Sequence, residues 1–451
     1  MRFLNALLIL TLSIFLFTGC QTTEKPKADG DAKKDGATKT EEGKKDDKAK
    51  GKKVRFYGNN LCFTAQYLDK KTCEKVAAQF AAIGYNSVRF HHYDNNLIDK
   101  TAGNSTTLDK SLMDKLDYLF YCFKRKGIYI TTDLFCSRRF KAGEVAGFGK
   151  LTHYEMKALA PINEAAFDNW KTFSRKLLTH KNPYTGMSWT EDPALFAISV
   201  VNEDTIYHVW KQYPAIKEAY LKKFDKYLQD NNVNCKNDRE RSRALSKFLI
   251  DLQIKSYIRM KDFLKNELKV QAQLSDANFT NPVLLAFLRE KLDYVDNHAY
   301  WDHPSFIKRP WSLPHRYKNI SAIKRFAEVP RHMMPSRIMG KPFMVTEFNY
   351  CFPNNFRAEG GVLMGAYASL QDWDGLYRFA YSHNIQGIIY KNPIRGFDLV
   401  CDPLNMLSEK LGILLFLRHD VASSQKSIPF LFGEKSFDNV TNMNWIKCTK
   451  I

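Results

Sequence analysis

The sequence of 451 residues lacks the patterns that identify a metal site or a framework of disulfide bonds. It has nine cysteines, but none is spaced as a CxxC pair or in a cysteine–histidine arrangement that binds zinc. It also has no nucleic-acid-binding motif, although its formal net charge is +20. We therefore expect no metal, no cofactor and no nucleic-acid partner. Such a charge favours acidic polymers or anionic lipid surfaces, but a generic solvated basic surface accounts for it more simply.

The apolar run Leu4–Phe17 is shorter than the roughly 20 residues that a membrane-spanning helix needs. With Arg2 before it, the run is typical of an export signal over residues 1–20. The ending LFTGC resembles the bacterial lipobox, which implies that Cys20 is diacylated and becomes the new N-terminus. An uncleaved helical anchor and plain secretion are the alternatives. Gln21 stands where an aspartate usually marks inner-membrane retention, which favours the outer membrane.

Residues 21–53 contain no aromatic side chain and are rich in lysine and acidic residues. Such a segment cannot bury enough apolar surface to offset its ordering entropy, so we expect a disordered, charged linker. Together with acylated Cys20, the linker predicts a protein tethered to a lipid bilayer of the bacterial cell envelope, on the periplasmic or cell-surface side.

From residue 54 onward, short apolar runs alternate with long amphipathic stretches, which is the pattern of repeated strand–helix units. Eight such units predict an α/β fold, a (β/α)₈ TIM barrel over residues 54–423. Gly84 and Gly127 fall where two of the helices end. The expected strands are 54–60, 84–91, 127–134, 195–203, 269–276, 292–300, 341–348 and 375–382.

Two connections are too long to be passive. Residues 135–163 follow the third expected strand and residues 205–243 follow the fourth. Both leave the carboxyl ends of strands, which form the catalytic face of this kind of barrel. The short tail 424–451 has strand-like pieces and is too short for a domain.

Two expected strands end in a glutamate. Glu203 ends the apolar run LFAISVVNE, and Glu347 ends the run KPFMVTE. A barrel places the ends of its parallel strands on one rim, so we expect the two carboxylates to face each other about 5 Å apart, as in a retaining glycosidase. Either glutamate alone fits a salt-bridge partner as well; the two positions together favour catalysis.

Other polar residues fall at neighbouring strand ends. An arginine beside a carboxylate lowers the pKa of that carboxylate, as a nucleophile requires. An ordinary interior ion pair, a core histidine and a packed tyrosine are the structural alternatives. The expected substrate-binding residues are Arg89, Asn202, His298 and Tyr300, followed by His91, His92, Asp133, Trp301 and Tyr381.

The stretches GYNSVRFHHYD, DPALFAISVVNE, DNHAY and KPFMVTEFN together resemble clan A of the glycoside hydrolases, nearest to the family 5 cellulases and mannanases. The resemblance covers residues 54–418. It implies a retaining double displacement without cofactor, on an oligo- or polysaccharide. It assigns Glu203 as the acid/base and Glu347 as the nucleophile.

The sequence departs from the family at two points. Asp204 follows the acid/base where the family often has proline. The tryptophan that commonly follows strand 8 is missing, so Tyr381 or His383 would take its place, unless residues 385–392 form that strand instead. A catalytically inactive, surface glycan-binding protein on the same barrel is the alternative function, and a metal hydrolase is a weaker one. We expect a monomer.

Overall fold

The computed structural model describes residues 53–433, except 205, 280–282, 391–392 and 432. The expected export signal, Cys20, nearly all of the linker and most of the tail lie outside the described residues. In the described part of the chain, no helix is long and apolar enough to cross a membrane.

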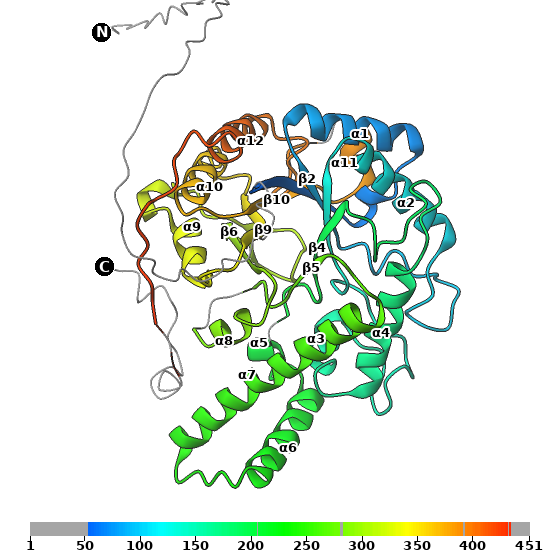
Figure 1. Cartoon of the computed structure of the whole chain (residues 1–451), viewed down its shortest axis with the longest axis vertical. Helices are drawn as coiled ribbons and strands as arrows, with labels where there is room; N and C mark the ends of the chain where they lie inside the picture. Colours follow the sequence, from blue (N-terminus) through cyan, green and yellow to red (C-terminus); the bar gives the residue numbers. More distant parts are fainter. Residues whose placement is uncertain (1–52, 205, 280–282, 391–392, 432, 434–451) are drawn as a thin grey trace, which may run out of the picture. The chain divides into compact units, whose positions relative to one another are not determined.

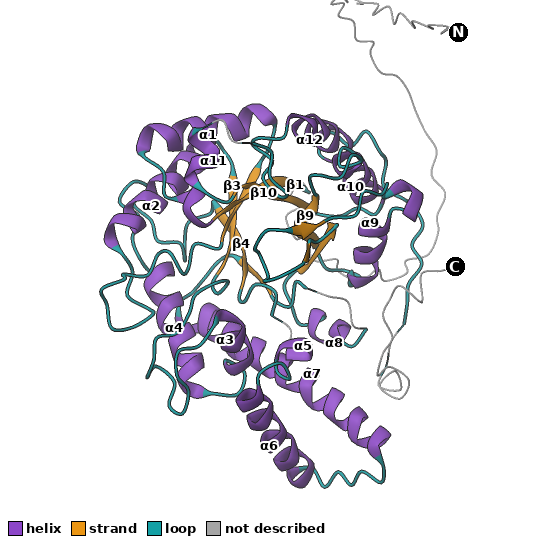
Figure 2. Cartoon of the chain, turned by 180° about the vertical axis from the view of Figure 1, so that it is seen from behind, coloured by secondary structure: helices purple, strands orange, loops and turns teal. Residues whose placement is uncertain are grey.

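Eight parallel strands form a nearly closed barrel at the centre, with helices around it (Figure 2). The strand order is β5-β4-β3-β2-β1-β10-β9-β6, so sequence neighbours mostly pair and β1 pairs with β10. A TIM-barrel-like fold was expected, and the structure confirms it. The strands are β1 Phe56–Cys62, β2 Ser87–His91, β3 Tyr129–Asp133, β4 Leu195–Ser199, β5 Gln273–Ser275, β6 Val295–Trp301, β9 Phe343–Tyr350 and β10 Gly375–Ser382.

The two ends of the ladder, β5 and β6, have no strand pairing with each other among the described residues. Side chains and turns cross this gap instead. The carboxylate of Asp293 accepts a hydrogen bond from the backbone N–H of Leu274 at 3.0 Å, and the N–H of Asp293 donates to the carbonyl of Leu274 at 3.0 Å. Asn278, after β5, donates to Asp296 in β6 at 3.1 Å.

The helices begin and end where local sequence dictates. Asp69, Asp109 and Asn163 accept backbone N–H bonds at the first turns of α1, α2 and α4. Gly84 ends α1 with a φ of 104°, a conformation that glycine adopts without strain. The main helices are α1 Lys70–Ile83, α2 Lys110–Arg125, α3 His153–Leu159, α4 Glu164–Leu178, α5 Ile206–Val209, α6 Pro214–Asp230, α7 Asp238–Asp262, α8 Leu285–Arg289, α9 Glu328–Met333, α10 Glu359–Leu370, α11 Ile385–Ile389 and α12 Pro403–Phe416.

Several expectations need correction. The fourth strand ends at Ser199, so Glu203 lies in the turn after it. The long connection after β4 consists mainly of α5, α6 and the start of α7, and α6 and α7 project together from the barrel (Figure 1). Residues 385–389 are the helix α11, which confirms 375–382 as strand 8. The described tail residues 424–431 contain no strand. An unexpected hairpin, β7 Ser305–Phe306 and β8 His315–Arg316, follows β6.

Candidate active site

Glu203 and Glu347 meet at the carboxyl ends of the strands. Glu347 is in the fully buried strand β9, and its side chain is 3% exposed. Glu203 lies four residues beyond β4 with a φ of 49°, and its side chain is 31% exposed. Carboxylate oxygens of the two residues and a ring nitrogen of His298 all lie within 4.8 Å of one another. This separation fits a retaining glycosidase, in which the carboxyl groups are about 5–5.5 Å apart.

Glu347 is surrounded by hydrogen-bond donors. One guanidinium nitrogen of Arg89 lies 2.7 Å from Oε1, and Nε2 of His91 lies 3.0 Å from the same oxygen. The Tyr300 hydroxyl donates to Oε2. Burial alone would raise the pKa of Glu347, but the positive charges of His298, His91 and Arg89 outweigh it and hold the pKa well below its usual value. Glu347 is therefore ionised, as a nucleophile must be.

Asp133, at the end of β3, fixes these donors from behind. Its Oδ1 accepts from Arg89 at 2.6 Å, and its Oδ2 pairs with Nδ1 of His91 at 2.6 Å. Burial works against ionisation of Asp133, but Arg89 and His91 lower its pKa overall. Arg89 also donates to Oδ1 of Asn202 at 2.9 Å. The hydrogen bonds of the Asn202 side chain to other described residues all use this oxygen, so its amide nitrogen can donate to a ligand.

Glu203 pairs with His298 of β6. Nδ1 of His298 lies 3.2 Å from Oε1 of Glu203, and Nε2 lies 2.9 Å from the Thr346 hydroxyl. That hydroxyl donates to Asp296, so its oxygen accepts from Nε2–H of the histidine. A hydrogen bond between Nδ1 and Glu203 then requires one proton, carried by either the imidazole or the carboxyl group. The pair can hold the proton that a general acid delivers.

Two of the other expected residues, His92 and Trp301, pack among core side chains. His92 packs its ring 4.5 Å from that of Phe63, and burial together with His91 lowers the pKa of His92 well below its usual value. Trp301 is buried and its indole N–H donates to the carbonyl of Ile320 at 2.8 Å. Both have structural contacts that account for their positions.

The structure does not bring Tyr381 to the glutamates. Its ring packs 4.8 Å from that of Phe80 in α1, on the helix side of the barrel. His383, the other expected platform residue, instead pairs with Asp398 and lies 5.1 Å from the ring of Phe379.

Aromatic residues that were not expected stand around Tyr300. The rings of Phe379 and Phe397 lie 5.8 and 5.5 Å from it. Trp311, in the loop between β7 and β8, is 60% exposed and lies 6.1 Å from Phe397. Its place in an irregular loop gives no periodic signal, so sequence analysis missed it. Phe397 separates Trp311 from Tyr300, so this exposed ring is a candidate stacking platform at the outer edge of the site.

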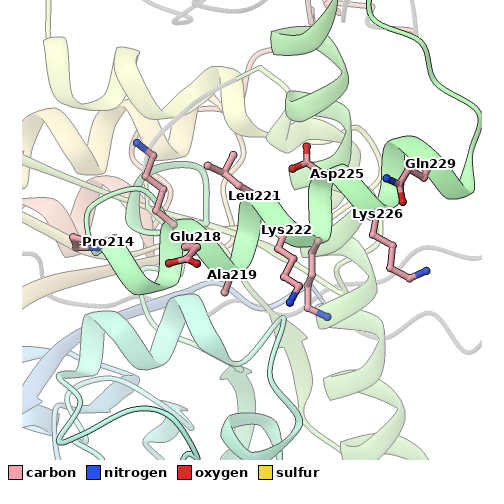
Figure 3. A pocket seen from close by; sticks show the side chains of 10 residues that line it. Pro214, Glu218, Ala219, Leu221, Lys222, Asp225, Lys226 and Gln229 are labelled. Carbon is pink, nitrogen blue, oxygen red and sulfur yellow. The ribbon is translucent and has the colours of Figure 1, made fainter.

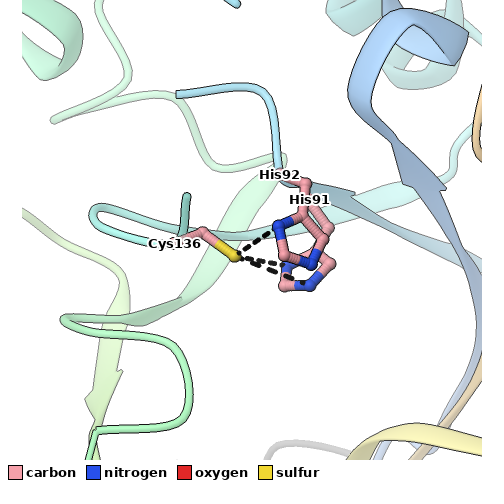
Figure 4. Close-up of side chains that lie close together, drawn as sticks. All are labelled: His91, His92 and Cys136. Atoms are coloured by element: carbon pink, nitrogen blue, oxygen red, sulfur yellow. Dashed lines mark hydrogen bonds between the residues drawn. The ribbon is translucent and has the colours of Figure 1, made fainter. Parts of the chain in front are cut away.

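His91, His92 and Cys136 bring three metal-ligating side chains together (Figure 4). The sulfur of Cys136 lies 3.1 Å from Nδ1 of His92 and 3.7 Å from Nε2 of His91. Both nitrogens of His91 already serve Asp133 and Glu347, however, and burial raises the pKa of the Cys136 thiol well above its usual value. A metal here would have to displace the contacts that support Glu347, so this cluster fits a structural role better.

A hollow of about 980 Å³ lies along α6 (Figure 3). Its lining residues all come from this one helix, between Pro214 and Gln229, and neither glutamate is among them. It has no set of polar groups converging from several elements, which an active site requires.

Comparison with solved structures follows this geometry. No protein-family model and no curated protein matches the sequence. In structure, the chain is similar to an endo-1,4-β-D-mannanase from Thermotoga petrophila, with 15% identity, a TM-score of 0.52, and coverage of 80% of this chain and 100% of that chain. It is also similar to an endo-1,4-β-mannanase from Rhizomucor miehei, with 13% identity, a TM-score of 0.50, and coverage of 81% of this chain and 95% of that chain. A third similar structure is a glycoside hydrolase family 5 mannosidase from Rhizomucor miehei in complex with mannosyl-fructose. Its identity is 13% and its TM-score 0.50, with coverage of 80% of this chain and 93% of that chain.

Two of these neighbours are described as mannanases and the third as a family 5 glycoside hydrolase. At these identities the likeness establishes the fold alone. It agrees with the resemblance found in the sequence, and it covers about four fifths of the chain.

Proposed function

We propose that this protein is a retaining glycoside hydrolase that cleaves β-linked glycans, with Glu347 as nucleophile and Glu203 as acid/base. The close approach of the two carboxylates, in different surroundings, carries this proposal. Glu347 is buried among cationic donors, whereas Glu203 is partly exposed and lies 3.2 Å from Nδ1 of His298. Two carboxyl groups at this distance in unlike environments suit the two roles.

In the first step, an oxygen of Glu347 attacks the anomeric carbon while Glu203 gives its proton to the departing glycosidic oxygen. The bond from carbon to the leaving sugar breaks as the bond to Glu347 forms. In the second step, Glu203 removes a proton from water, the water oxygen attacks the same carbon, and Glu347 is released. Two inversions leave the configuration unchanged.

The surrounding residues would assist at defined points. The amide N–H of Asn202 can donate to the sugar 2-hydroxyl, a bond that strengthens in the transition state. Tyr300 and Arg89 hold the attacking carboxylate in place. Trp311 would stack against a sugar further from the bond that is cleaved.

The test is incubation with a panel of β-linked glycans, including β-1,4-mannan and β-1,4-glucan, followed by proton NMR of the first-formed products. We expect shorter products with retained β configuration. Binding without cleavage would favour the glycan-binding alternative, and an inverted product would contradict the assignment of Glu347.

We also propose that the chain is tethered to the cell envelope through acylated Cys20. The lipobox-like ending LFTGC is the observation that supports it. Labelling with a radioactive fatty acid should mark the protein, and the Cys20→Ser variant should remain unlabelled. Equal labelling of both would contradict the proposal.

A further inference from the structure

Behind Glu203, three buried polar side chains from different elements meet. They are Asp204 in the turn after β4, Gln253 in α7 and Asp276 just after β5, with exposures of 2, 1 and 1%. The amide nitrogen of Gln253 donates to Asp204 at 2.9 Å and to Asp276 at 3.0 Å. One side chain therefore uses both of its N–H hydrogens to join two carboxyl groups.

The cluster and the neighbouring Asn278 hold the backbone at Glu203 and just after it. The carbonyl oxygen of Gln253 accepts from the backbone N–H of Ile206 at 3.3 Å, which also fixes the orientation of its amide. Asn278, two residues after Asp276, accepts the backbone N–H of Glu203 at 2.6 Å. A shift of Gln253 or Asp276 would therefore move the turn that carries Glu203.

Burial favours the neutral form of both carboxyl groups in this cluster. Burial raises the pKa of Asp204 to about 6, and burial together with Asp204 raises that of Asp276 well above its usual value. The second oxygen of each carboxyl group has no hydrogen-bond partner among the described residues. The charged and titratable groups around the pair are Lys157 of α3, Tyr220 of α6, Tyr257 of α7 and Arg289 of α8.

On the basis of the proposed function, we propose that Gln253 is a positioning residue for the acid/base. The Asp204–Gln253–Asp276 cluster holds Glu203 at the leaving-group oxygen and connects it to the projecting helix α7. Without Gln253, the two carboxyl groups lose their common donor and Ile206 loses its acceptor. Small displacements of a catalytic group have large effects on rate, because proton transfer needs close alignment.

The test is the Gln253→Met variant of the full chain, measured on aryl β-mannobiosides and β-cellobiosides whose leaving groups range from dinitrophenol to methylphenol. A good leaving group needs little protonation, so kcat/KM for dinitrophenyl substrates should stay within about threefold of wild type. For methylphenyl substrates it should fall by about 30-fold or more, because general acid catalysis contributes about 10²–10⁴-fold. Tyr300 and Arg89 remain unchanged, so the nucleophile keeps its contacts.

Asp117→Asn is a matched control. Asp117 in α2 is also buried, with a pKa raised by burial to about 6, but it pairs with His180 on the outer helix layer. This variant should lower kcat/KM equally for all leaving groups or not at all. Infrared spectra at pH 7 should show a protonated carboxyl band in wild type that loses intensity in Asp276→Asn, a readout that needs no activity.

The outcomes separate the two claims. If Gln253→Met lowers kcat/KM in parallel across the series, the positioning role is overturned while the glycosidase proposal stands. If wild type cleaves none of the aryl or polymeric substrates, the proposed function fails and the positioning role fails with it. An unchanged infrared band in Asp276→Asn would show that Asp276 is not the protonated carboxyl group of the cluster.

Discussion

The carboxylates of Glu203 and Glu347 approach within 4.8 Å, yet only one of them is surrounded by fixed cations. Glu347 receives bonds from a guanidinium and an imidazole, whereas Glu203 faces one ring nitrogen and partial solvent. The difference comes from the elements that carry them. A buried strand presents Glu347 to β2, while a turn leaves Glu203 partly exposed to solvent.

The two glutamates should respond differently to removal. Glu347→Ala and Glu203→Ala should each lose nearly all activity on glycans, because one lacks the nucleophile and the other the acid/base. Azide should restore part of the activity in both. Glu347→Ala should yield an α-glycosyl azide by direct displacement, and Glu203→Ala a β-glycosyl azide from the covalent intermediate. The anomeric configuration of each azide is read by NMR, and wild-type rates in both variants would contradict the assignment.

Activity should persist into acid. The pKa of Glu347 lies well below the ordinary 4.5, so the acidic limb of kcat/KM should fall below pH 4.5. Arg89→Met removes a positive charge, which should move this limb to higher pH, whereas Arg89→Lys keeps the charge and should move it less. The pH profiles of the three proteins check this, with circular dichroism to show that each is folded. Identical limbs would mean that Arg89 does not set the ionisation of Glu347.

Trp311 should matter for long substrates only. We expect Trp311→Ala to raise KM for oligosaccharides by about tenfold, since an aromatic contact contributes about 0.5–1.5 kcal/mol beyond its buried area. The kcat should be nearly unchanged, because the side chain is far from the bond that breaks. Trp311→Phe should recover part of the loss. Equal KM values for all three proteins would exclude the platform.

The closing helix depends on one buried ion pair. Arg378 in β10 lies 2.7 Å from Glu409 in α12, and both side chains are fully buried. Tyr85 adds a hydrogen bond to the same carboxylate at 2.9 Å. Glu409→Gln leaves the guanidinium uncompensated and should cost about 3–5 kcal/mol of unfolding free energy. Urea unfolding measures this, and Asp420→Asn, in an exposed pair with Arg418, should leave the midpoint unchanged.

The sequence was enough to predict the barrel and the meeting of Glu203 and Glu347, because each apolar run that ends in one of these carboxylates leads to the same rim. Arg89 and His298 were placed near the glutamates by the same argument from strand ends. Tyr381 was misplaced, because the pairing of β1 with β10 is irregular between Arg378 and Ser382, and such an irregularity changes which side chains face inward.

Hydrogen bonds between distant segments could not be predicted from the sequence, for a different reason. Gln253 lies in the middle of a long helix, and nothing in its neighbours indicates that its amide meets Asp204 and Asp276. The shortening of β4 to Ser199 was equally hidden, because Val200 and Val201 are buried and as apolar as strand residues.

The break in the barrel lies close to both glutamates. Glu203 follows β4 and Glu347 lies in β9, and each of these strands is separated from the break by one strand. The shorter path around the barrel from β4 to β9 crosses the break between β5 and β6. There, amide and carboxylate side chains such as Asn278 and Asp296 set the distance between the strands, rather than a continuous backbone ladder. A ladder has a fixed repeat, but side chains change with single substitutions. Under the proposed function, the distance between the two carboxylates, and with it the stereochemistry of the products, would be adjustable here without rebuilding the scaffold.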